Sequence, residues 1–206
     1  MAKKSGLKTG KFGGIIVDNY LQTSDKDIYA IGDCTENLNL ITNKYEYWPL
    51  GSIATKMGRI CADNICGRKT EIKGYIGTAM FTIFDINIAR TGLTMESAEK
   101  NGLKTESIII SGLDKSHYTE HADYIFLKIL ADKESRVILG AQGFGKGDII
   151  GRISILACAI SNSMKLDEIF KLDLGYHPAY NNPIDIVQTA SLALINKLDG
   201  LLKQSL

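Results

Sequence analysis

The chain contains 206 residues, of which 45% are hydrophobic and 23% are charged. This composition excludes a fibrous or an intrinsically disordered protein, and the length accommodates one large domain or two small ones. Because 24 Lys and Arg residues stand against 23 Asp and Glu residues, the net charge of +1 predicts no nucleic-acid partner. No apolar run reaches the roughly 18 residues that a membrane helix needs, and the polar N-terminus does not resemble a signal peptide. We therefore expect a cytoplasmic protein with no membrane partner.

The first part of the chain predicts short strands separated by polar loops. An apolar stretch at residues 14–18 predicts a strand. A second apolar stretch at residues 28–31 predicts a buried strand, which Gly32-Asp33 ends sharply. Residues 37–47 are polar and predict a loop.

A helix is predicted over residues 50–66. Pro49 precedes it, and proline is favoured at a helix start because its missing N–H would be unpaired there. Gly67 is a suitable end. The apolar residues expected on its buried face are Ile53, Met57, Ile60, Cys61 and Ile65.

The pattern changes near Gly74, which predicts two domains, residues 1–74 and residues 75–206. Strands are predicted at residues 78–84, 86–90, 105–111, 124–131 and 137–142. Helices are predicted at residues 94–101, 148–163, 166–172 and 183–202. Thr94 is the expected N-cap of the first of these helices, and residues 143–147 are expected to be a glycine-rich connection. The second domain is therefore predicted to be an α+β unit, an antiparallel sheet with helices on one face.

Four cysteines are scattered along the sequence: Cys34, Cys61, Cys66 and Cys158. They form no C-x-x-C pair, and their spacing matches neither the common zinc sites nor a thioredoxin-type motif. We expect them to be small buried apolar residues in a reducing compartment. His117 and His121 are four residues apart but fall in a predicted loop without a third His or Cys nearby, so no metal site is predicted.

Two places in the first domain could bind a ligand. The carboxylate of Asp33, next to Gly32 at the end of a strand, can accept hydrogen bonds from sugar or ribitol hydroxyls, or it can cap the next segment. The helix start at Leu50, Gly51 and Ser52 offers free N–H groups and a partial positive charge. An anion or an electron-rich carbonyl could lie there, although every helix has such an end.

A third place lies in the second domain, where residues 176–180 read Tyr-His-Pro-Ala-Tyr. Such a kinked polar and aromatic segment is typical of a loop that forms a site, and surface packing of the aromatic rings is the alternative. Neither a Ser-His-Asp arrangement nor a pair of catalytic carboxylates can be argued from the sequence.

Taken together, these segments resemble a known family. Residues 23–34 resemble the second flavin-binding motif of the FAD-dependent pyridine nucleotide-disulfide oxidoreductases, and residues 49–59 resemble the helix that follows it. From Gly77 onward the chain is similar to the dimerisation domain of that family, with signatures at residues 81–85, 89–93, 138–142 and 176–180. The chain thus resembles the C-terminal half of such an enzyme, in the branch of NADH oxidase, NADH peroxidase and coenzyme A-disulfide reductase.

The resemblance implies a fold and roles for individual residues. The dimerisation domain would follow the C-terminal part of a Rossmann-like flavin-binding domain, and residues 2–16 would be the last piece of the nicotinamide domain. Gly32 and Asp33 would contact the ribitol of FAD, and the helix start at Leu50, Gly51 and Ser52 would face the flavin. In a homodimer, the catalytic residues that this chain contributes to the partner's site would be Tyr180, His177 and Tyr118.

The resemblance also identifies what these residues lack: the glycine motifs for the ADP part of FAD and for NAD(P)H, and the redox cysteine. The parent chemistry would be hydride transfer from NAD(P)H to FAD and then electron transfer to a disulfide, peroxide or oxygen. This chain alone is expected to be inactive. The alternative is a non-catalytic dimerisation module that retains a remnant of the flavin site. The substrate (coenzyme A disulfide, persulfide, peroxide or oxygen) and the choice of NADH or NADPH stay open.

Overall fold

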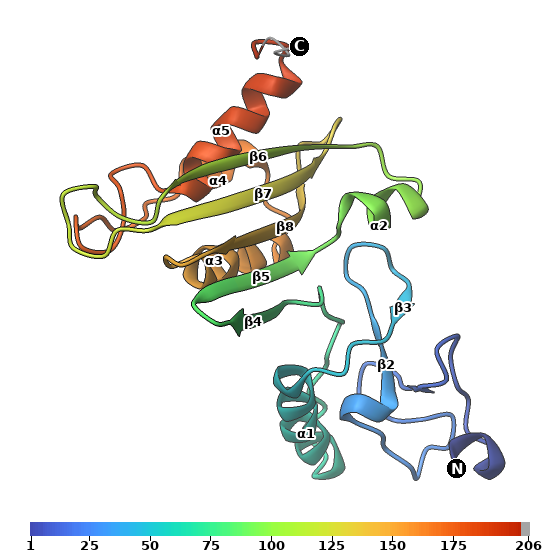
Figure 1. Cartoon of the computed structure of the whole chain (residues 1–206). Coiled ribbons are helices and arrows are strands. Elements are labelled where there is room, and N and C mark those ends of the chain that lie inside the picture. Colours follow the sequence, from blue (N-terminus) through green and yellow to red (C-terminus); the bar gives the residue numbers. More distant parts are fainter. Residues whose placement is uncertain (203–206) are drawn as a thin grey trace. The chain divides into compact units, whose positions relative to one another are not determined.

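The computed structural model describes residues 1–202, and the chain divides into two units, Met1–Gly77 and Thr78–Leu206 (Figure 1). The first unit contains one small sheet, with strands in the order β1-β2-β3. Its strands are β1 (Ile15–Ile16), β2 (Thr35–Leu38) and β3 (Tyr45–Glu46). Strand β2 pairs in parallel with β1 and antiparallel with β3. The helices of the unit are two 3-10 turns (Ala2–Ser5 and Gly32–Cys34) and α1 (Gly51–Ile65).

Helix α1 forms as its sequence predicts. Leu50 is the N-cap residue and has an extended backbone, as N-cap residues typically do. Ile53, Met57 and Cys61 recur every fourth residue, so they share one face and are buried together with the apolar residues of the first unit. Ile65, which was predicted on the same face, is exposed at the last turn. That part of the prediction was wrong because the core ends one turn before the helix does.

The predicted strand at residues 28–31 is absent, and this prediction was wrong. The segment forms a single bridge, between Tyr29 and Gln22, and Ile28 and Ile31 are each 38% exposed. The strand lies instead at β2, partly inside the predicted polar loop. Its polar residues Glu36 and Asn37 are buried. Polarity therefore misled the prediction, because these side chains lie inside the unit.

Glu36 explains two glycines of the first unit. Its side chain is fully buried, and its Oε1 accepts hydrogen bonds from the N–H groups of Phe12 (2.8 Å) and Gly14 (3.0 Å). A Cβ added to Gly10 would lie 2.1 Å from Oε2 of this carboxylate, and one added to Gly14 would lie 2.8 Å from its Cγ. The turn before β1 therefore needs glycine at both positions, because the buried carboxylate occupies the space of a side chain.

Because Tyr75 has a buried hydroxyl, we expect the first unit to become less stable in alkali. Its hydroxyl is buried without a hydrogen-bond partner among residues 1–202, and burial raises its pKa from 10.0 to about 12. The unfolded chain releases this proton near pH 10 whereas the folded chain keeps it, so stability falls between about pH 10 and pH 12. We predict that Tyr75→Phe removes this loss and stabilises the unit by about 1 kcal/mol at neutral pH.

Urea unfolding followed by the fluorescence of the single tryptophan, Trp48, would measure this difference at each pH. The difference between the two proteins isolates Tyr75 from the other groups that titrate in alkali. Parallel stability curves for the variant and the original chain would contradict the prediction.

The second unit is built on a five-stranded antiparallel sheet in the order β4-β5-β8-β7-β6. Its strands are β4 (Ala79–Ile83), β5 (Ile86–Gly92), β6 (Thr105–Leu113), β7 (Tyr124–Asp132) and β8 (Ile138–Gly145). Its helices are α2 (Met95–Lys100), α3 (Ile150–Ser161), α4 (Leu166–Phe170) and α5 (Ile186–Leu198). All five strands and four helices lie close to their predicted positions, and the side chain of Thr94 caps α2 as expected.

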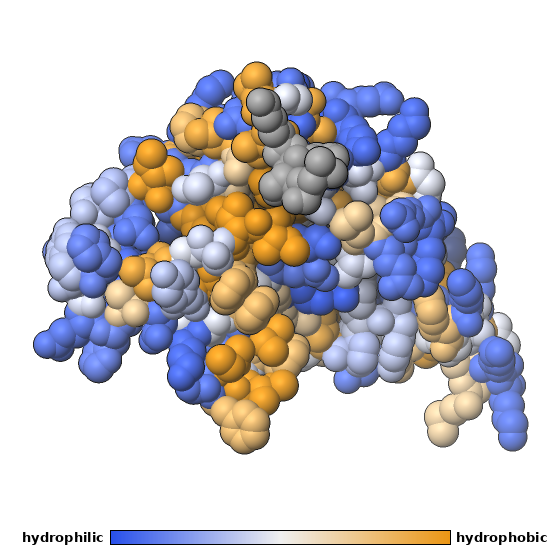
Figure 2. Space-filling model, turned by 45° about the horizontal axis from the view of Figure 1, so that its top comes forward, coloured by the Kyte–Doolittle hydropathy of each residue, from blue (hydrophilic) through white to orange (hydrophobic). Residues whose placement is uncertain are grey.

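The two faces of this sheet differ. Helix α3 packs on β5 and β8 and helix α5 packs on β6 and β7, which buries Ile125, Leu127 and Ile129 completely. The opposite face carries a row of apolar side chains in register across four strands: Phe81, Ile88, Phe144 and Phe126. The rings of Phe126 and Phe144 stack with their centroids 4.7 Å apart. Figure 2 shows a hydrophobic patch bordered by hydrophilic residues on the side of the molecule that it presents.

Gly143 and Gly145 belong to strand β8, and only Gly147 lies in the connection that was predicted at residues 143–147. Strand β8 extends to Gly145, and a Cβ on Gly143 would lie 2.4 Å from the side chain of Ile149. Gly140, earlier in the strand, is tighter still, because a Cβ there would lie 1.9 Å from the carbonyl oxygen of Leu93. The close approach of other segments of the chain therefore explains why glycine is found at positions 140 and 143.

Burial of all four cysteines was also wrongly predicted. All four are free thiols, but Cys61 alone is buried, whereas Cys34, Cys66 and Cys158 are exposed. Burial raises the pKa of the Cys61 thiol, so this residue packs as an apolar group. Among residues 1–202, no group of three or more His, Cys, Asp or Glu side chains is placed to hold a metal ion. In the same residues no helix has the length and apolar character that crossing a bilayer requires.

Candidate functional site

The structure places the Gly32-Asp33 turn directly against helix α1. Gly32 has a φ of +69°, which favours glycine, and a Cβ there would lie 3.2 Å from the Cβ of Ala54 in the first turns of the helix. Its N–H donates to Sδ of the buried Met57 (3.4 Å), and its carbonyl accepts from the hydroxyl of Thr35 (2.7 Å). These contacts fix the turn and leave the carboxylate of Asp33 exposed.

The start of helix α1 is open to a ligand. Gly51 and Ser52 are exposed, and no side chain caps the helix. The first N–H groups of an α-helix have no partner within the helix, and together they carry a partial positive charge. A Cβ on Gly51 would meet no atom within 4 Å, so a ligand can reach the backbone there. The Gly32 contact with Ala54 therefore brings a carboxylate and a set of free N–H groups to the same end of one helix.

A cavity of about 540 Å³ opens beside Asp33 in the first unit. Its walls are mainly apolar, and its volume lies in the range of small-molecule sites. The lining residues are Met1, Ala2, Ser5, Leu7, Phe12, Gly13, Gly14, Ile15, Ile28, Asp33, Cys34 and Tyr47.

In the second unit, two loops that are distant in sequence lie together. The first (residues 114–123) carries Tyr118, and the second (residues 175–184) carries His177 and Tyr180. The N–H of Ser116 in the first loop donates to the carbonyl of Pro178 in the second (3.2 Å), so the backbones touch directly. The side chains of Tyr118 and Tyr180 are 67% and 75% exposed. We call these two segments the site loops.

The second site loop is also folded on itself. The carbonyl of His177 accepts hydrogen bonds from the N–H groups of Tyr180 (2.8 Å) and Asn181 (3.1 Å). The side chain of Asn181 donates to the carbonyl of Gly175 (2.7 Å). The rings of His177 and Tyr180 lie with their centroids 5.4 Å apart, so the two predicted catalytic side chains of this loop are neighbours.

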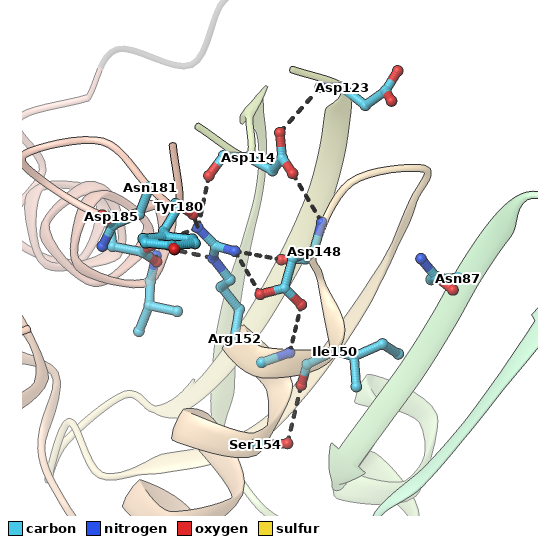
Figure 3. A network of polar contacts seen from close by, with 12 residues as sticks. Asn87, Asp114, Asp123, Asp148, Ile150, Arg152, Ser154, Tyr180, Asn181 and Asp185 are labelled. Atoms are coloured by element: carbon cyan, nitrogen blue, oxygen red, sulfur yellow. Dashed lines mark hydrogen bonds and ion pairs between the residues drawn. The ribbon is translucent and has the colours of Figure 1, made fainter. Parts of the chain in front are cut away.

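Beneath the site loops lies a buried ion-pair network centred on Arg152 of helix α3, shown in Figure 3. Its guanidinium pairs with the carboxylate of Asp185, with N–O distances of 3.1 Å from Nε and 3.0 Å from Nη2. Arg152 and Asp185 are both buried, and Asp185 is also the N-cap of helix α5. The Nη1 group donates to the carbonyl (2.7 Å) and the carboxylate (2.9 Å) of Asp148. Pairing and hydrogen bonding make this buried charge tolerable.

Asp114 connects this network to the first site loop. Its two carboxylate oxygens accept from the N–H groups of Asp123 (3.0 Å) and Asp148 (3.1 Å), which closes the loop at its base. A Cβ on Gly147 would lie 2.6 Å from the carboxyl carbon of Asp114, so glycine is required where these two segments of the chain approach each other.

The sequence did not identify Arg152, Asp185 or Asp114 as site residues. Arg152 is the single charged residue in the apolar stretch at residues 149–160, and this lone charge was a signal. A charged residue inside an apolar helix is rarely buried without a partner. The predicted residues fall into two groups: Gly32 and Asp33 lie beside the α1 start, and Tyr118, His177 and Tyr180 lie on the site loops.

Comparison with known families matches both units. The family description "Pyridine nucleotide-disulphide oxidoreductase, dimerisation domain" matches residues 78–187, more than half of the chain. The description "Pyridine nucleotide-disulphide oxidoreductase" matches residues 1–58. The second match includes the Gly32-Asp33 turn and the start of helix α1.

Individual relatives agree. The chain is 34% identical over 180 residues to "NAD(P)H sulfur oxidoreductase (CoA-dependent)" of Pyrococcus furiosus, a match that covers 87% of this chain and 40% of the relative. It is 34% identical over 188 residues to "NADH oxidase" of Lactococcus lactis subsp. cremoris, which covers 90% of this chain and 42% of the relative.

A solved structure, that of a NAD-dependent persulfide reductase from A. fulgidus, superposes with a TM-score of 0.96 at 41% identity. The superposition covers 98% of this chain and 37% of that one. The chain therefore spans about 40% of the length of the curated relatives. Both of its units, in their fold and in their sequence, place the chain in the pyridine nucleotide-disulphide oxidoreductase family.

Proposed function

We propose that residues 1–206 are the C-terminal part of a flavoprotein that uses NAD(P)H and FAD to reduce a sulfur substrate. The single observation that carries this proposal is the family match to both units in order, at residues 1–58 and 78–187. Within this proposal, residues 1–74 are the remnant of the nicotinamide and FAD-binding domains, and residues 75–206 are the interface domain.

The first unit fits the flavin end of FAD. The exposed carboxylate of Asp33 can accept hydrogen bonds from ribityl hydroxyls, and Gly32 keeps this turn close to the helix. The free N–H groups at Leu50, Gly51 and Ser52 provide positive potential, which favours an electron-rich carbonyl. When bound, FAD supplies the hydride-transfer chemistry, and the protein supplies position and electrostatics.

The second unit fits the role of an interface that also delivers side chains. We propose a homodimer in which Tyr118, His177 and Tyr180 act at the partner's redox cysteine. The family description of a dimerisation domain supports this arrangement. So does the apolar row on the open face of the sheet, because exposed apolar patches of this kind are typical of protein interfaces. A cytoplasmic location is part of the same proposal, and the four free thiols support it.

Persulfide or a coenzyme A-linked sulfur compound is the favoured substrate class. The A. fulgidus and P. furiosus relatives are named for such activities, and the first of them is 41% identical over 98% of the chain. Oxygen is the second candidate, because the L. lactis relative named NADH oxidase is 34% identical. The exposed phenol of Tyr180 supports a role at the partner subunit's site with either substrate.

The test is to sequence upstream of the Met1 codon and to produce the protein from the complete reading frame. The expected protein carries a G-x-G-x-x-G motif and a redox cysteine, binds FAD, and consumes NAD(P)H with a persulfide. Tyr180→Phe in that protein is expected to lower kcat about 100-fold, the range of a lost proton donor. Tyr176→Phe, on the same loop, is the matched control and should leave kcat within about twofold.

Residues 1–206 alone are expected to show no NAD(P)H-dependent reduction of persulfide, peroxide or oxygen above a free-FAD control. Turnover by this chain alone would contradict the proposal that the missing parts carry the cofactor and the redox cysteine. A stop codon and a ribosome-binding site directly upstream of Met1 would favour the alternative, a dimerisation module without catalysis.

A further inference from the structure

We propose that Arg152 is a positioning residue that holds both site loops in one arrangement. A single nitrogen of its guanidinium, Nη2, donates to the carbonyl of Asp114 (2.7 Å) and to the carbonyl of Tyr180 (3.2 Å). One of these acceptors begins the first site loop, and the other is the backbone of a predicted catalytic residue. The same side chain therefore sets the position of both loops at once (Figure 3).

The remaining contacts of Arg152 explain why it can serve as a fixed anchor. Its charge is balanced by Asp185, which is held in turn as the N-cap of helix α5, where its Oδ1 accepts from the N–H of Val187 (3.0 Å). Its Nη1 group is occupied by Asp148. A planar guanidinium presents five N–H groups in a rigid fork, so all of these contacts fix one orientation. A lysine ammonium could not span the same set.

The site loops need such an anchor because their functional side chains contribute little packing. Tyr118 and Tyr180 are mostly exposed, so burial of their rings does not order the loops. The direct backbone link between the loops is the hydrogen bond from Ser116 N–H to the carbonyl of Pro178 (3.2 Å). The side chain of Asn182 in the second loop also donates to the carbonyl of Leu113 (2.9 Å), the last residue of β6. The order of the loops therefore depends on the backbone carbonyls that Arg152 binds.

The test uses a variant that keeps the fold but removes the anchor. Arg152→Met combined with Asp185→Asn removes both charges of the buried pair, so neither is left without its partner, and asparagine still caps helix α5. Hydrogen exchange in residues 1–206 is then followed at the amide of Ser116, which is buried and bonded to the other loop. We expect exchange at Ser116 to become at least about tenfold faster, as expected for the loss of a hydrogen-bond network. The amides of β7 in the sheet should change less than about twofold.

The matched control is Arg136→Met combined with Asp199→Asn, which removes an exposed ion pair of the same chemistry in the same unit. It is expected to leave exchange at Ser116 unchanged. Unchanged exchange at Ser116 in the Arg152→Met/Asp185→Asn variant would overturn the proposal. Equal acceleration in β7 and in the site loops would also overturn it, because that pattern would mean general destabilisation.

A second measurement rests on the proposed function and uses the protein from the complete reading frame. There the double variant is expected to lower kcat about tenfold or more while the KM for NAD(P)H stays within about twofold, because the nucleotide site is not touched. A rise in KM for NAD(P)H with unchanged kcat would overturn the positioning role. If the complete protein lacks reductase activity, the proposed function fails, whereas faster exchange at Ser116 would still support Arg152 as the anchor.

Discussion

Replacing Arg152 by methionine alone is expected to lower the free energy of unfolding of the second unit by about 3–5 kcal/mol. The substitution leaves the carboxylate of Asp185 buried without its counter-charge, and it leaves the carbonyls of Asp114 and Tyr180 without a donor. Adding Asp185→Asn should recover most of the loss, because it removes the buried charge. Urea unfolding followed by far-UV circular dichroism would measure each member of this double-mutant cycle.

The control for this prediction is Arg136→Met. Arg136 and Asp199 form an ion pair in the same unit, but both side chains are more than a third exposed. Its loss is expected to cost no more than about 1 kcal/mol. If Arg152→Met lowers the free energy of unfolding as little as Arg136→Met does, then pairing with Asp185 does not stabilise the second unit, which contradicts the prediction.

Gly140→Ala is expected to cost about 3 kcal/mol or more. The new methyl group would lie 1.9 Å from the carbonyl oxygen of Leu93, and this backbone atom cannot move without disturbing the bond from Leu93 N–H to the carbonyl of Leu139 (2.8 Å). The strain would therefore spread into the pairing of β5 with β8 in the middle of the sheet.

Gly112→Ala provides the comparison within the same sheet. A Cβ at Gly112 would meet its nearest neighbour, Cδ1 of Ile186, at 3.9 Å, which is an ordinary contact. Its expected effect is within about 1 kcal/mol of zero, since alanine also restricts the unfolded chain. Similar melting curves for Gly140→Ala and Gly112→Ala would show that the sheet relaxes around the added methyl group.

The second unit could be predicted well because its elements carry strong local signals. The strands alternate or run apolar over five to nine residues, and Thr94 and the residues before helix α5 supply N-caps. The sheet order could not be read in the same way, since β8 pairs with β5 across two intervening strands. A close contact accompanies this pairing at Gly140, where a Cβ would meet the backbone of Leu93 just after β5, and only the folded chain reveals it.

The first unit was harder to predict. Residues 28–31 have the composition of a buried strand, but they are bound along one edge only, by the hydrogen bond from Ala30 N–H to the carbonyl of Leu21 and by that from Thr23 N–H to the carbonyl of Ile28. In contrast, β2 is polar in sequence yet buried, because Glu36 bonds to backbone N–H groups. Composition predicts burial correctly on average. The prediction fails where a polar side chain is buried because it forms hydrogen bonds with buried backbone N–H groups.

The candidate site residues likewise divide into those with local sequence signals and those brought together only by folding. Asp33 and the start of helix α1 are local features, so a turn signal and a helix start were enough to predict them as parts of a candidate site. The network of Arg152 joins residues that are 33 and 38 positions apart in the sequence, Asp185 and Asp114. No spacing rule predicts such a contact. The sequence does show a single arginine in an apolar helix. Such an arginine indicates a buried ion pair, because a charged side chain is rarely buried without a partner.

The exposed thiol of Cys34 follows Asp33 directly and lies in the wall of the same cavity. The rate at which a small reagent alkylates Cys34 therefore reports whether the cavity is occupied. This rate should fall when a molecule fills the cavity. Cys66 and Cys158, also exposed, supply internal references on the same polypeptide, and the buried Cys61 supplies a marker of unfolding. Mass spectrometry of the four alkylated cysteines would thus report binding of a ligand without an assay of turnover.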